Sequence, residues 1–253
     1  MPTFINRGQA IHYEVHGSGL PVLLLHGICV SFSGNFGAWG WIERLTARGL
    51  RVIGMDFRGH GKSAKSHDPK DYGFENLSSD VLALLDYLAI EKASLVGYSL
   101  GSAVALQLLH KHPDRFNQSV LIATGDGLIG IPPYTLSEVS ATLRPALERS
   151  EFPVDLPSHI AAYWNFATKV GGDRLASLAA ASSPMQASTS SEAASIKVPV
   201  LVVSGQVDPV LGQGSLLAKS MPNGRYIEIP GADHFALAAL PLAQTEVANF
   251  LAG

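Results

Sequence analysis

A serine with a glycine two positions to either side stands in the segment Gly97-Tyr98-Ser99-Leu100-Gly101. The pattern predicts a buried strand just before this segment and a helix just after it. A serine at such a sharp turn has a strained backbone, and small neighbours let the turn close. The turn lifts the hydroxyl above the sheet, beside the N–H groups of the helix N-terminus. The segment therefore predicts Ser99 as a nucleophile, with a Gly/Ser-rich turn that has no chemical role as the alternative.

The elements that must hold this serine alternate between strand and helix through the first 125 residues. Short apolar runs predict buried strands, and apolar residues at helical spacing predict helices. Repeated strand–helix units indicate an α/β fold with a mostly parallel sheet flanked by helices. The predicted strands are 11–15, 22–25, 52–55, 94–96, 119–123, 200–204 and 226–229, and the predicted helices are 39–48, 77–89, 100–112, 213–219 and 235–251.

The alternation stops between residues 125 and 196, where several prolines separate short helical pieces. It then resumes, so this stretch is an insertion between two strands of the sheet. We interpret 125–196 as a small helical lid inserted after the sixth core strand, and 1–124 with 197–253 as the core domain. An ordinary structural elaboration is the alternative. A lid rich in aromatic residues predicts an apolar pocket, with Trp164 as a substrate-binding residue.

Composition limits the classes of function. The 253 residues suffice for one large α/β domain, and a net charge of −3 does not suggest the basic surface that nucleic-acid binding needs. The single cysteine, Cys29, excludes an intrachain disulfide. The N-terminus shows no secretory signal, and no apolar run is long enough to span a bilayer. We expect a cytoplasmic protein that binds neither nucleic acid nor membranes, as a monomer or weak homodimer.

Five segments in a fixed order resemble the α/β-hydrolase family, in particular its small cofactor-free esterases, lactonases and haloperoxidase-like members. The resemblance covers nearly the whole chain and implies the α/β-hydrolase fold, with catalytic residues in the chain order Ser, acid, His. It also implies that His26 and His60 shape loops. This chain departs from the family pattern at Asp233, where many relatives have Gly. The segments are Leu25-His26-Gly27, Asp56-Phe57-Arg58-Gly59-His60-Gly61-Lys62-Ser63, Gly97-Tyr98-Ser99-Leu100-Gly101, Gly205-Gln206-Val207-Asp208 and Gly231-Ala232-Asp233-His234-Phe235.

The resemblance implies His234 as the general base, because it alone among nine histidines follows the last predicted strand in a Gly-led loop. It implies Asp208, after strand 200–204, as the acid that orients this base. An Asp-Pro turn without chemistry is the alternative for Asp208. Asp126 is its rival, because some relatives supply the acid from the preceding strand.

The resemblance further implies an oxyanion hole made by the backbone N–H groups of Ile28 and Leu100. Gly27 and Tyr98 are the other predicted substrate-binding residues. Cys29 lies beside the hole, without a sequence feature that makes it reactive. The phosphate-loop and dinucleotide patterns fail, and no His, Cys and carboxylate cluster has metal-ligand spacing. We expect no cofactor and no metal.

Together these residues predict a serine hydrolase that cleaves a small carboxylic ester through an acyl-enzyme on Ser99. Family members that act on epoxides or carbon–halogen bonds use Asp at the elbow, where this chain has Ser. Lactone hydrolysis and carbon–carbon bond hydrolysis by the same triad are alternatives, because a fold hosts many reactions. A slow-turnover receptor for a small molecule and a scaffold without activity are alternatives from other classes.

Overall fold

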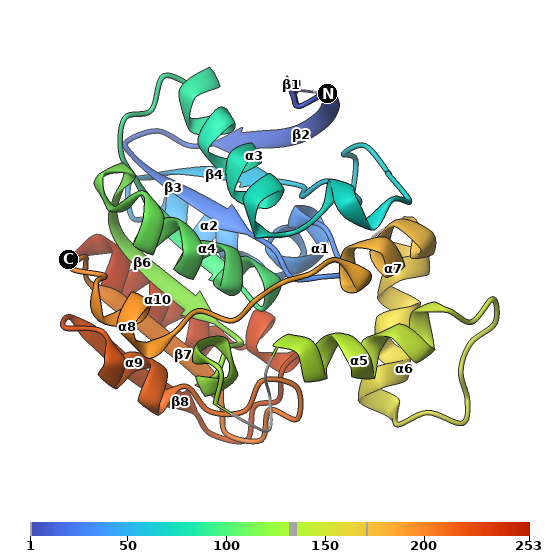
Figure 1. Cartoon of the computed structure of the whole chain (residues 1–253). Helices are drawn as coiled ribbons and strands as arrows, with labels where there is room; N and C mark the ends of the chain where they lie inside the picture. Colours follow the sequence, from blue (N-terminus) through green and yellow to red (C-terminus); the bar gives the residue numbers. More distant parts are fainter. Residues whose placement is uncertain (1, 132–135, 171) are drawn as a thin grey trace.

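The computed structural model describes residues 2–131, 136–170 and 172–253. Eight strands form one sheet in the order β1-β2-β4-β3-β5-β6-β7-β8 (Figure 1). β2 runs antiparallel to β1 and β4, and the pairs from β4 to β8 are parallel. The strands are β1 (Thr3–Asn6), β2 (Gln9–His16), β3 (Leu20–Leu25), β4 (Leu50–Met55), β5 (Ala93–Tyr98), β6 (Phe116–Ile122), β7 (Val200–Gly205) and β8 (Gly224–Ile229). The helices are α1 (Phe32–Asn35), α2 (Trp41–Thr46), α3 (Phe74–Tyr87), α4 (Leu100–Lys111), α5 (Leu136–Leu147), α6 (Ser158–Asn165), α7 (Arg174–Ser182), α8 (Ser190–Ala194), α9 (Ser215–Ser220) and α10 (Pro241–Ala252). The predicted α/β fold with a mostly parallel sheet is confirmed.

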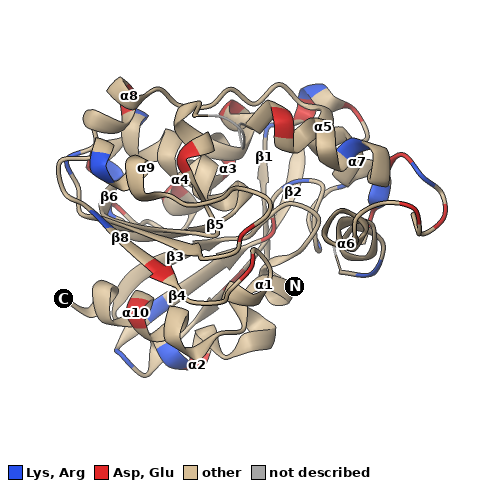
Figure 2. Cartoon of the chain, turned by 90° about the horizontal axis from the view of Figure 1, so that it is seen from below, with Lys and Arg blue, Asp and Glu red and all other residues tan. Residues whose placement is uncertain are grey.

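Helices cover both faces of this sheet because its central strands are apolar on both sides. In β3, Val22 and Leu24 pack with α2 and α10, whereas Leu23 and Leu25 pack with α3 and α4. Successive side chains of a strand point to opposite faces, so a continuous apolar run needs two layers of helices. Each buried Leu or Val contributes about 1.5–3 kcal/mol. The strands β3, β5, β6 and β7 accordingly contain no charged residue. In Figure 2 the charged residues lie mainly on the helices and loops around the sheet.

The segment between β6 and β7 carries α5, α6, α7 and α8. α5 packs against α6 and α7, and these three helices lie together to one side of the sheet (Figure 1). α8 instead packs against α4 and α9, which flank the sheet. Residues 132–135 and 171 of the predicted insertion lie outside the described residues. The insertion therefore has two parts, of which only the part with α5, α6 and α7 stands off the sheet.

One strand was not predicted, and some helices begin later than the sequence predicted. β1 was not predicted, because a four-residue strand with the single buried residue Phe4 leaves little pattern. It pairs with β2 across a tight turn in which Arg7 and Gly8 both have positive φ. The helix predicted at 39–48 begins at Trp41, after Gly40 in the left-handed region. The helix predicted at 235–251 begins at Pro241, in the first-turn position that proline favours.

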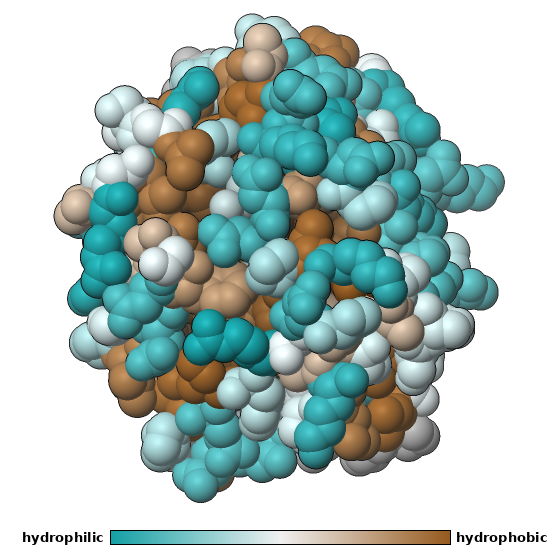
Figure 3. All heavy atoms as spheres, turned by 90° about the vertical axis from the view of Figure 1, so that its left-hand side faces the viewer, coloured by the Kyte–Doolittle hydropathy of each residue, from teal (hydrophilic) through white to brown (hydrophobic). Residues whose placement is uncertain are grey.

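The outer surface mixes polar and apolar residues. On the face that carries the C-terminus, hydrophilic residues interrupt the apolar ones (Figure 3). The large exposed apolar side chains belong to several elements, among them Ile5 in β1, Leu216 in α9 and Leu242 in α10. Single exposed side chains of this kind are ordinary in folded proteins. Within the described ranges, no helix combines the length and the apolar character that crossing a membrane requires.

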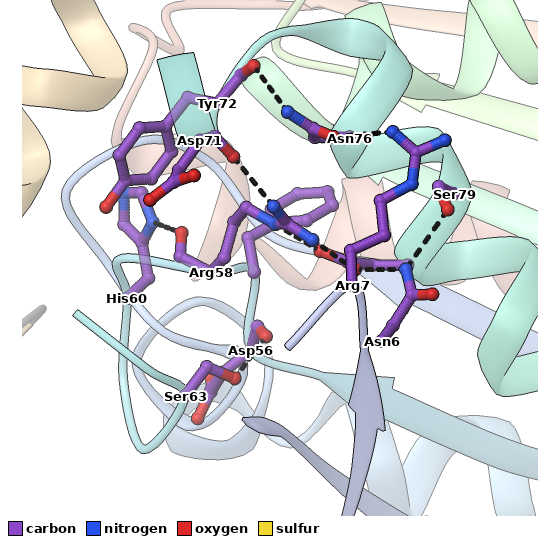
Figure 4. A network of polar contacts seen from close by, with 12 residues as sticks. Asn6, Arg7, Asp56, Arg58, His60, Ser63, Asp71, Tyr72, Asn76 and Ser79 are labelled. Atoms are coloured by element: carbon purple, nitrogen blue, oxygen red, sulfur yellow. Dashed lines mark hydrogen bonds and ion pairs between the residues drawn. The ribbon is translucent and has the colours of Figure 1, made fainter. Parts of the chain in front are cut away.

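A buried ion pair fixes the loop that follows β4. Arg58 donates to both carboxylate oxygens of Asp80 in α3, at 2.7 and 2.8 Å, and to the carbonyl of Asp71 at 2.8 Å. Asn6 at the end of β1 donates to Asp80 at 2.7 Å and to Ser79 at 3.1 Å (Figure 4). Both charges of the pair are buried, so removing either one would leave the other unpaired at a cost of about 3–5 kcal/mol. The network ties this loop to β1 and α3.

Two buried histidines join the loop after β4 to the loop after β3. His26 accepts a hydrogen bond from the backbone N–H of Phe57 at 2.9 Å and donates to the carbonyl of Gly27 at 2.6 Å. His60 donates to the carbonyl of Arg58 at 3.0 Å, and its Nε2 has no hydrogen-bond partner among the described residues. The two rings lie 5.3 Å apart. These contacts agree with the loop-shaping role that the resemblance implied for both residues.

The pKa values of these two histidines predict how the stability of the fold depends on pH. Burial lowers the pKa of His26 to about 4 and that of His60 to about 3. In the unfolded chain both histidines have a pKa near 6.5. Below that pH the unfolded chain therefore binds protons at two side chains that stay neutral in the folded protein. The free energy of unfolding should therefore fall as pH falls from about 6.5 towards 4, by about 1.4 kcal/mol per pH unit for each histidine. Urea unfolding at a series of pH values between roughly 5 and 6 measures this slope.

The variant His60→Asn separates this effect from other titrations. Its slope should be smaller than that of the wild type by about 1.4 kcal/mol per pH unit. The exposed His112 offers a matched control, and His112→Asn should leave the slope unchanged. Equal slopes for His60→Asn and the wild type would contradict the assignment.

Candidate active site

Ser99 occupies a strained turn between β5 and α4. Its φ of 53° and ψ of −110° lie outside the regions that residues with side chains prefer, at a cost of about 1–3 kcal/mol. A Cβ on Gly97 would lie 2.3 Å from the carbonyl oxygen of Gly101, and a Cβ on Gly101 would lie 2.1 Å from that of Leu25. Glycine is therefore required at both positions. The strand, turn and helix that the sequence predicted around Ser99 are all present.

Hydrogen bonds from the start of α4 secure this turn. The carbonyl of Ser99 accepts from the N–H groups of Ser102 at 2.9 Å and Ala103 at 3.2 Å. The buried hydroxyl of Ser102 donates to the carbonyls of Gly97 and Ile122. The small side chain at position 102 thus links the turn to both β5 and β6.

Three residues from three separate loops form a hydrogen-bonded chain. His234 Nε2 lies 3.0 Å from Ser99 Oγ, and His234 Nδ1 lies 2.8 Å from Asp208 Oδ2. Ser99 follows β5, Asp208 follows β7 and His234 follows β8. All three are buried, with only 8% of Ser99 exposed. The structure therefore brings together the serine, base and acid that the sequence singled out.

The surroundings of Asp208 keep it ionised. Burial acts to raise its pKa, but the charge of His234 and the hydrogen bonds to the carboxylate hold that pKa below its usual value. Its Oδ1 accepts from the backbone N–H groups of Val210 at 2.7 Å and Leu211 at 3.0 Å. The rival Asp126 instead accepts from the N–H of Leu217 in α9 at 2.7 Å. Of the two candidate acids, only Asp208 contacts the histidine.

Two side chains hold the loop that carries His234. Asp233, the departure from the family pattern, accepts from the N–H groups of Phe235 at 3.0 Å and Ala236 at 2.8 Å. Tyr98 donates its hydroxyl hydrogen to the carbonyl of His234 at 2.6 Å. Tyr98, the residue before Ser99, is therefore bonded to the backbone of His234. No sequence pattern predicts this contact, because it joins residues 136 positions apart.

The loop after β3 approaches Ser99 closely. A Cβ on Gly27 would lie 3.4 Å from Ser99 Cβ, and the N–H of Gly27 donates to Asn35 Oδ1 at 2.9 Å. The N–H groups of Ile28 and Leu100 donate no hydrogen bond within the described part of the chain. Unpaired N–H groups beside a serine hydroxyl can stabilise an oxyanion. Asn35, which orients this loop, carried no sequence signal, because it ends the four-residue helix α1, too short to leave a periodic pattern.

A cavity of about 100 Å³ opens at Ser99 and His234. The predicted substrate-binding residues Gly27 and Tyr98 line it, but Trp164 does not. The Trp164 ring packs on Phe152, and its N–H donates to a backbone carbonyl at 2.9 Å. Its neighbours Tyr163 and Phe166 line the cavity instead, because residues three apart share a helix face. The structure thus places the aromatic contacts one residue before and two residues after the predicted position.

Cys29 does not supply a second nucleophile to this site. Burial raises the pKa of the Cys29 thiol to about 12, so the reactive thiolate is not formed near neutral pH. Across residues 2–131, 136–170 and 172–253, no three or more His, Cys, Asp or Glu side chains are grouped so that they could hold a metal ion.

Comparison with known sequences shows a match to the alpha/beta hydrolase fold over residues 21–151. The chain is 39% identical over 140 residues to the dihydrolipoyllysine-residue acetyltransferase component of the acetoin cleaving system of Pseudomonas putida, a match covering 54% of this chain and 36% of that protein. It is 36% identical over 134 residues to epoxide hydrolase B of Mycobacterium tuberculosis, covering 50% of this chain and 36% of that protein. The match thus spans about a third of the length of these curated relatives.

Solved structures match over the whole fold. Est816, described as an N-acyl homoserine lactone degrading enzyme, is 26% identical with a TM-score of 0.78, covering 98% of this chain and 99% of that chain. The enol-lactonase from Burkholderia xenovorans LB400 is also 26% identical with a TM-score of 0.78, covering both chains completely, at 100% each.

The hydrogen bond from Tyr98 to His234 predicts a measurable role for the tyrosine hydroxyl. Tyr98→Phe leaves the buried carbonyl of His234 without this donor, which should lower the free energy of unfolding by about 1–3 kcal/mol. Because the imidazole is then held less firmly, we expect any Ser99-dependent activity to lose about tenfold in kcat. Steady-state kinetics and urea unfolding measure the two effects.

The matched control is Tyr226→Phe, which removes a hydroxyl on the edge strand β8. It should leave kcat unchanged. A Tyr98→Phe protein with wild-type kcat and wild-type stability would contradict a role for this hydrogen bond.

Proposed function

The chain belongs to the alpha/beta hydrolase fold family, and on that premise we propose that it is a serine hydrolase of small carboxylic esters. The observation that carries the proposal is the chain of hydrogen bonds from Asp208 through His234 to Ser99, at the mouth of an apolar cavity. A serine hydroxyl becomes a nucleophile when an adjacent base removes its proton, and this base is within reach. Ser99 is then the nucleophile, His234 the general base and Asp208 the acid that fixes the imidazole.

The first half of the proposed reaction forms an acyl-enzyme. Ser99 Oγ bonds to the ester carbonyl carbon while its proton moves to His234 Nε2. The carbonyl oxygen becomes an oxyanion, which the N–H groups of Ile28 and Leu100 stabilise by about 3 kcal/mol for each donor. The bond from this carbon to the alcohol oxygen then breaks, and that oxygen takes the proton from His234. Asp208 stabilises the imidazolium formed between these steps.

The second half releases the acid. A water molecule loses a proton to His234 as its oxygen bonds to the acyl carbon. The bond to Ser99 Oγ then breaks, and His234 returns the proton to that oxygen. The carboxylic acid leaves and the enzyme regains its starting state. The reaction consumes one water molecule and needs no cofactor.

Within the segment 125–196, we assign the part that carries α5, α6 and α7 the role of a lid on the same grounds. Tyr163 and Phe166, from α6 and its continuation, line the cavity with Phe235 from the core. Their rings lie 5.4–6.4 Å from one another, as packed aromatic pairs do. These contacts support a lid that supplies part of the substrate pocket.

Lactone hydrolysis is the second candidate, because two structural neighbours are described as a lactone-degrading enzyme and an enol-lactonase. A lactone is a cyclic ester, so the same serine, base and oxyanion hole would open it.

Hydrolysis of p-nitrophenyl acetate, butyrate and octanoate tests the proposal. We expect the wild type to release p-nitrophenol and Ser99→Ala, folded as judged by circular dichroism, to lose activity by about 10⁴-fold or more. Ser191→Ala, which removes an exposed hydroxyl from α8, is the matched control and should keep full activity. Full activity in folded Ser99→Ala would overturn the proposed mechanism.

A further inference from the structure

Two cavities of different character meet at Ser99. We call them the aromatic cavity, of about 100 Å³, and the aliphatic cavity, of about 40 Å³. Both are lined by Ile28 and Ser99, so the reacting carbon of a bound ester would lie between them. The aromatic cavity carries the rings of Trp39, Tyr98, Tyr163, Phe166 and Phe235, and the aliphatic cavity carries Leu100, Leu136, Val139, Leu143, Met185 and Leu211.

The position of the base assigns a substrate group to each cavity. In the tetrahedral intermediate the carbon bears Ser99 Oγ, the oxyanion, the alcohol oxygen and the acyl chain. The alcohol oxygen must reach His234 Nε2, because it leaves with the proton from that atom. His234 lines the aromatic cavity and does not line the aliphatic cavity. Leu100, whose N–H faces the oxyanion, lines the aliphatic cavity. The alcohol group therefore belongs in the aromatic cavity and the acyl chain in the aliphatic cavity.

The two volumes set the sizes of these groups. A water-sized atom needs about 10–15 Å³ of such space. The aliphatic cavity thus holds about three or four heavy atoms and the aromatic cavity about seven to ten. A short acyl chain fits the first, and a group with one aromatic ring fits the second, where ring-to-ring contacts are available.

The linings also decide the charge of the substrate. Within the described residues, neither cavity is lined by Asp, Glu, Lys or Arg. A carboxylate or ammonium group on the substrate would lose its water without gaining a charged partner, which is unfavourable.

We propose that the protein selects an uncharged, acyclic ester of a short aliphatic acid with an aryl-bearing alcohol. The proposal rests on the proposed function, because it assigns the two sides of the same reacting carbon. It separates esters from simple lactones, because a small ring keeps the acyl and alcohol parts together and cannot fill both cavities.

A pair of isomeric esters tests the assignment. Phenethyl acetate has a short acyl chain and an aryl-bearing alcohol, whereas ethyl phenylacetate has the same atoms with the two sides exchanged. Both leave an unactivated primary alcohol, so intrinsic reactivity differs little. We expect kcat/KM of the wild type to favour phenethyl acetate by about tenfold or more, a factor that corresponds to about 1.4 kcal/mol.

Two truncations should each weaken this preference, one through the acyl side of the substrate and the other through the alcohol side. Met185→Ala enlarges the aliphatic cavity and should raise kcat/KM for ethyl phenylacetate several-fold. Phe166→Ala removes a ring of the aromatic cavity and should raise KM for phenethyl acetate, with kcat for ethyl acetate much less affected. Leu175→Ala, on an exposed position of α7, is the matched control and should leave the ratio of the two isomers unchanged.

The outcomes separate this inference from the proposed function. If Ser99-dependent hydrolysis of p-nitrophenyl esters is present but the isomers are cleaved equally, not at all, or with the opposite preference, the cavity assignment is overturned and the proposed function stands. An unchanged isomer ratio in both Met185→Ala and Phe166→Ala would overturn it as well. If hydrolysis does not depend on Ser99, both proposals fail.

Discussion

The backbone strain at Ser99 is the constraint on which the rest of the site depends. A serine with φ of 53° persists only because the surrounding structure leaves it no alternative. Gly97 and Gly101 allow the carbonyl groups of neighbouring segments to approach within distances that no side chain tolerates. The core supplies the opposing stability, since β5 is buried along its whole length and α4 packs against it. The strain is thus stored at one residue and offset by apolar packing on both faces of the sheet.

The parallel sheet explains why residues far apart in sequence meet at this turn. Strands that run the same way end at the same edge, so the loops after β3, β5, β7 and β8 gather there. Each loop is then adjusted by a local bond. Asn35 holds Gly27, the N–H groups after Asp208 hold its carboxylate, and Tyr98 holds the carbonyl of His234. The positions of the site residues relative to one another therefore depend on hydrogen bonds between side chains and backbone as well as on the sheet.

Sequence reasoning succeeded where the signal is local and failed where it depends on a distant contact. The turn at Ser99 has a five-residue pattern with a steric cause, so it could be predicted together with its flanking strand and helix. Residue type alone did not separate Asp208 from Asp126, because both follow a strand. The family resemblance favoured Asp208, and the fold shows that of the two only Asp208 meets the histidine. Trp164 was named as a substrate-binding residue, but the sequence did not show which side of α6 faces the cavity, and the structure places Tyr163 there instead. Asn35 has no pattern at all.

Covalent labelling tests most directly whether His234 activates Ser99 for attack on a carbonyl. The folded chain would be treated with a fluorophosphonate, digested, and analysed by mass spectrometry. We expect one adduct per chain, on the peptide that contains Ser99, and strongly slowed labelling in a folded His234→Ala protein. An adduct on a different residue, or no adduct on the folded wild type, would contradict this activation of Ser99.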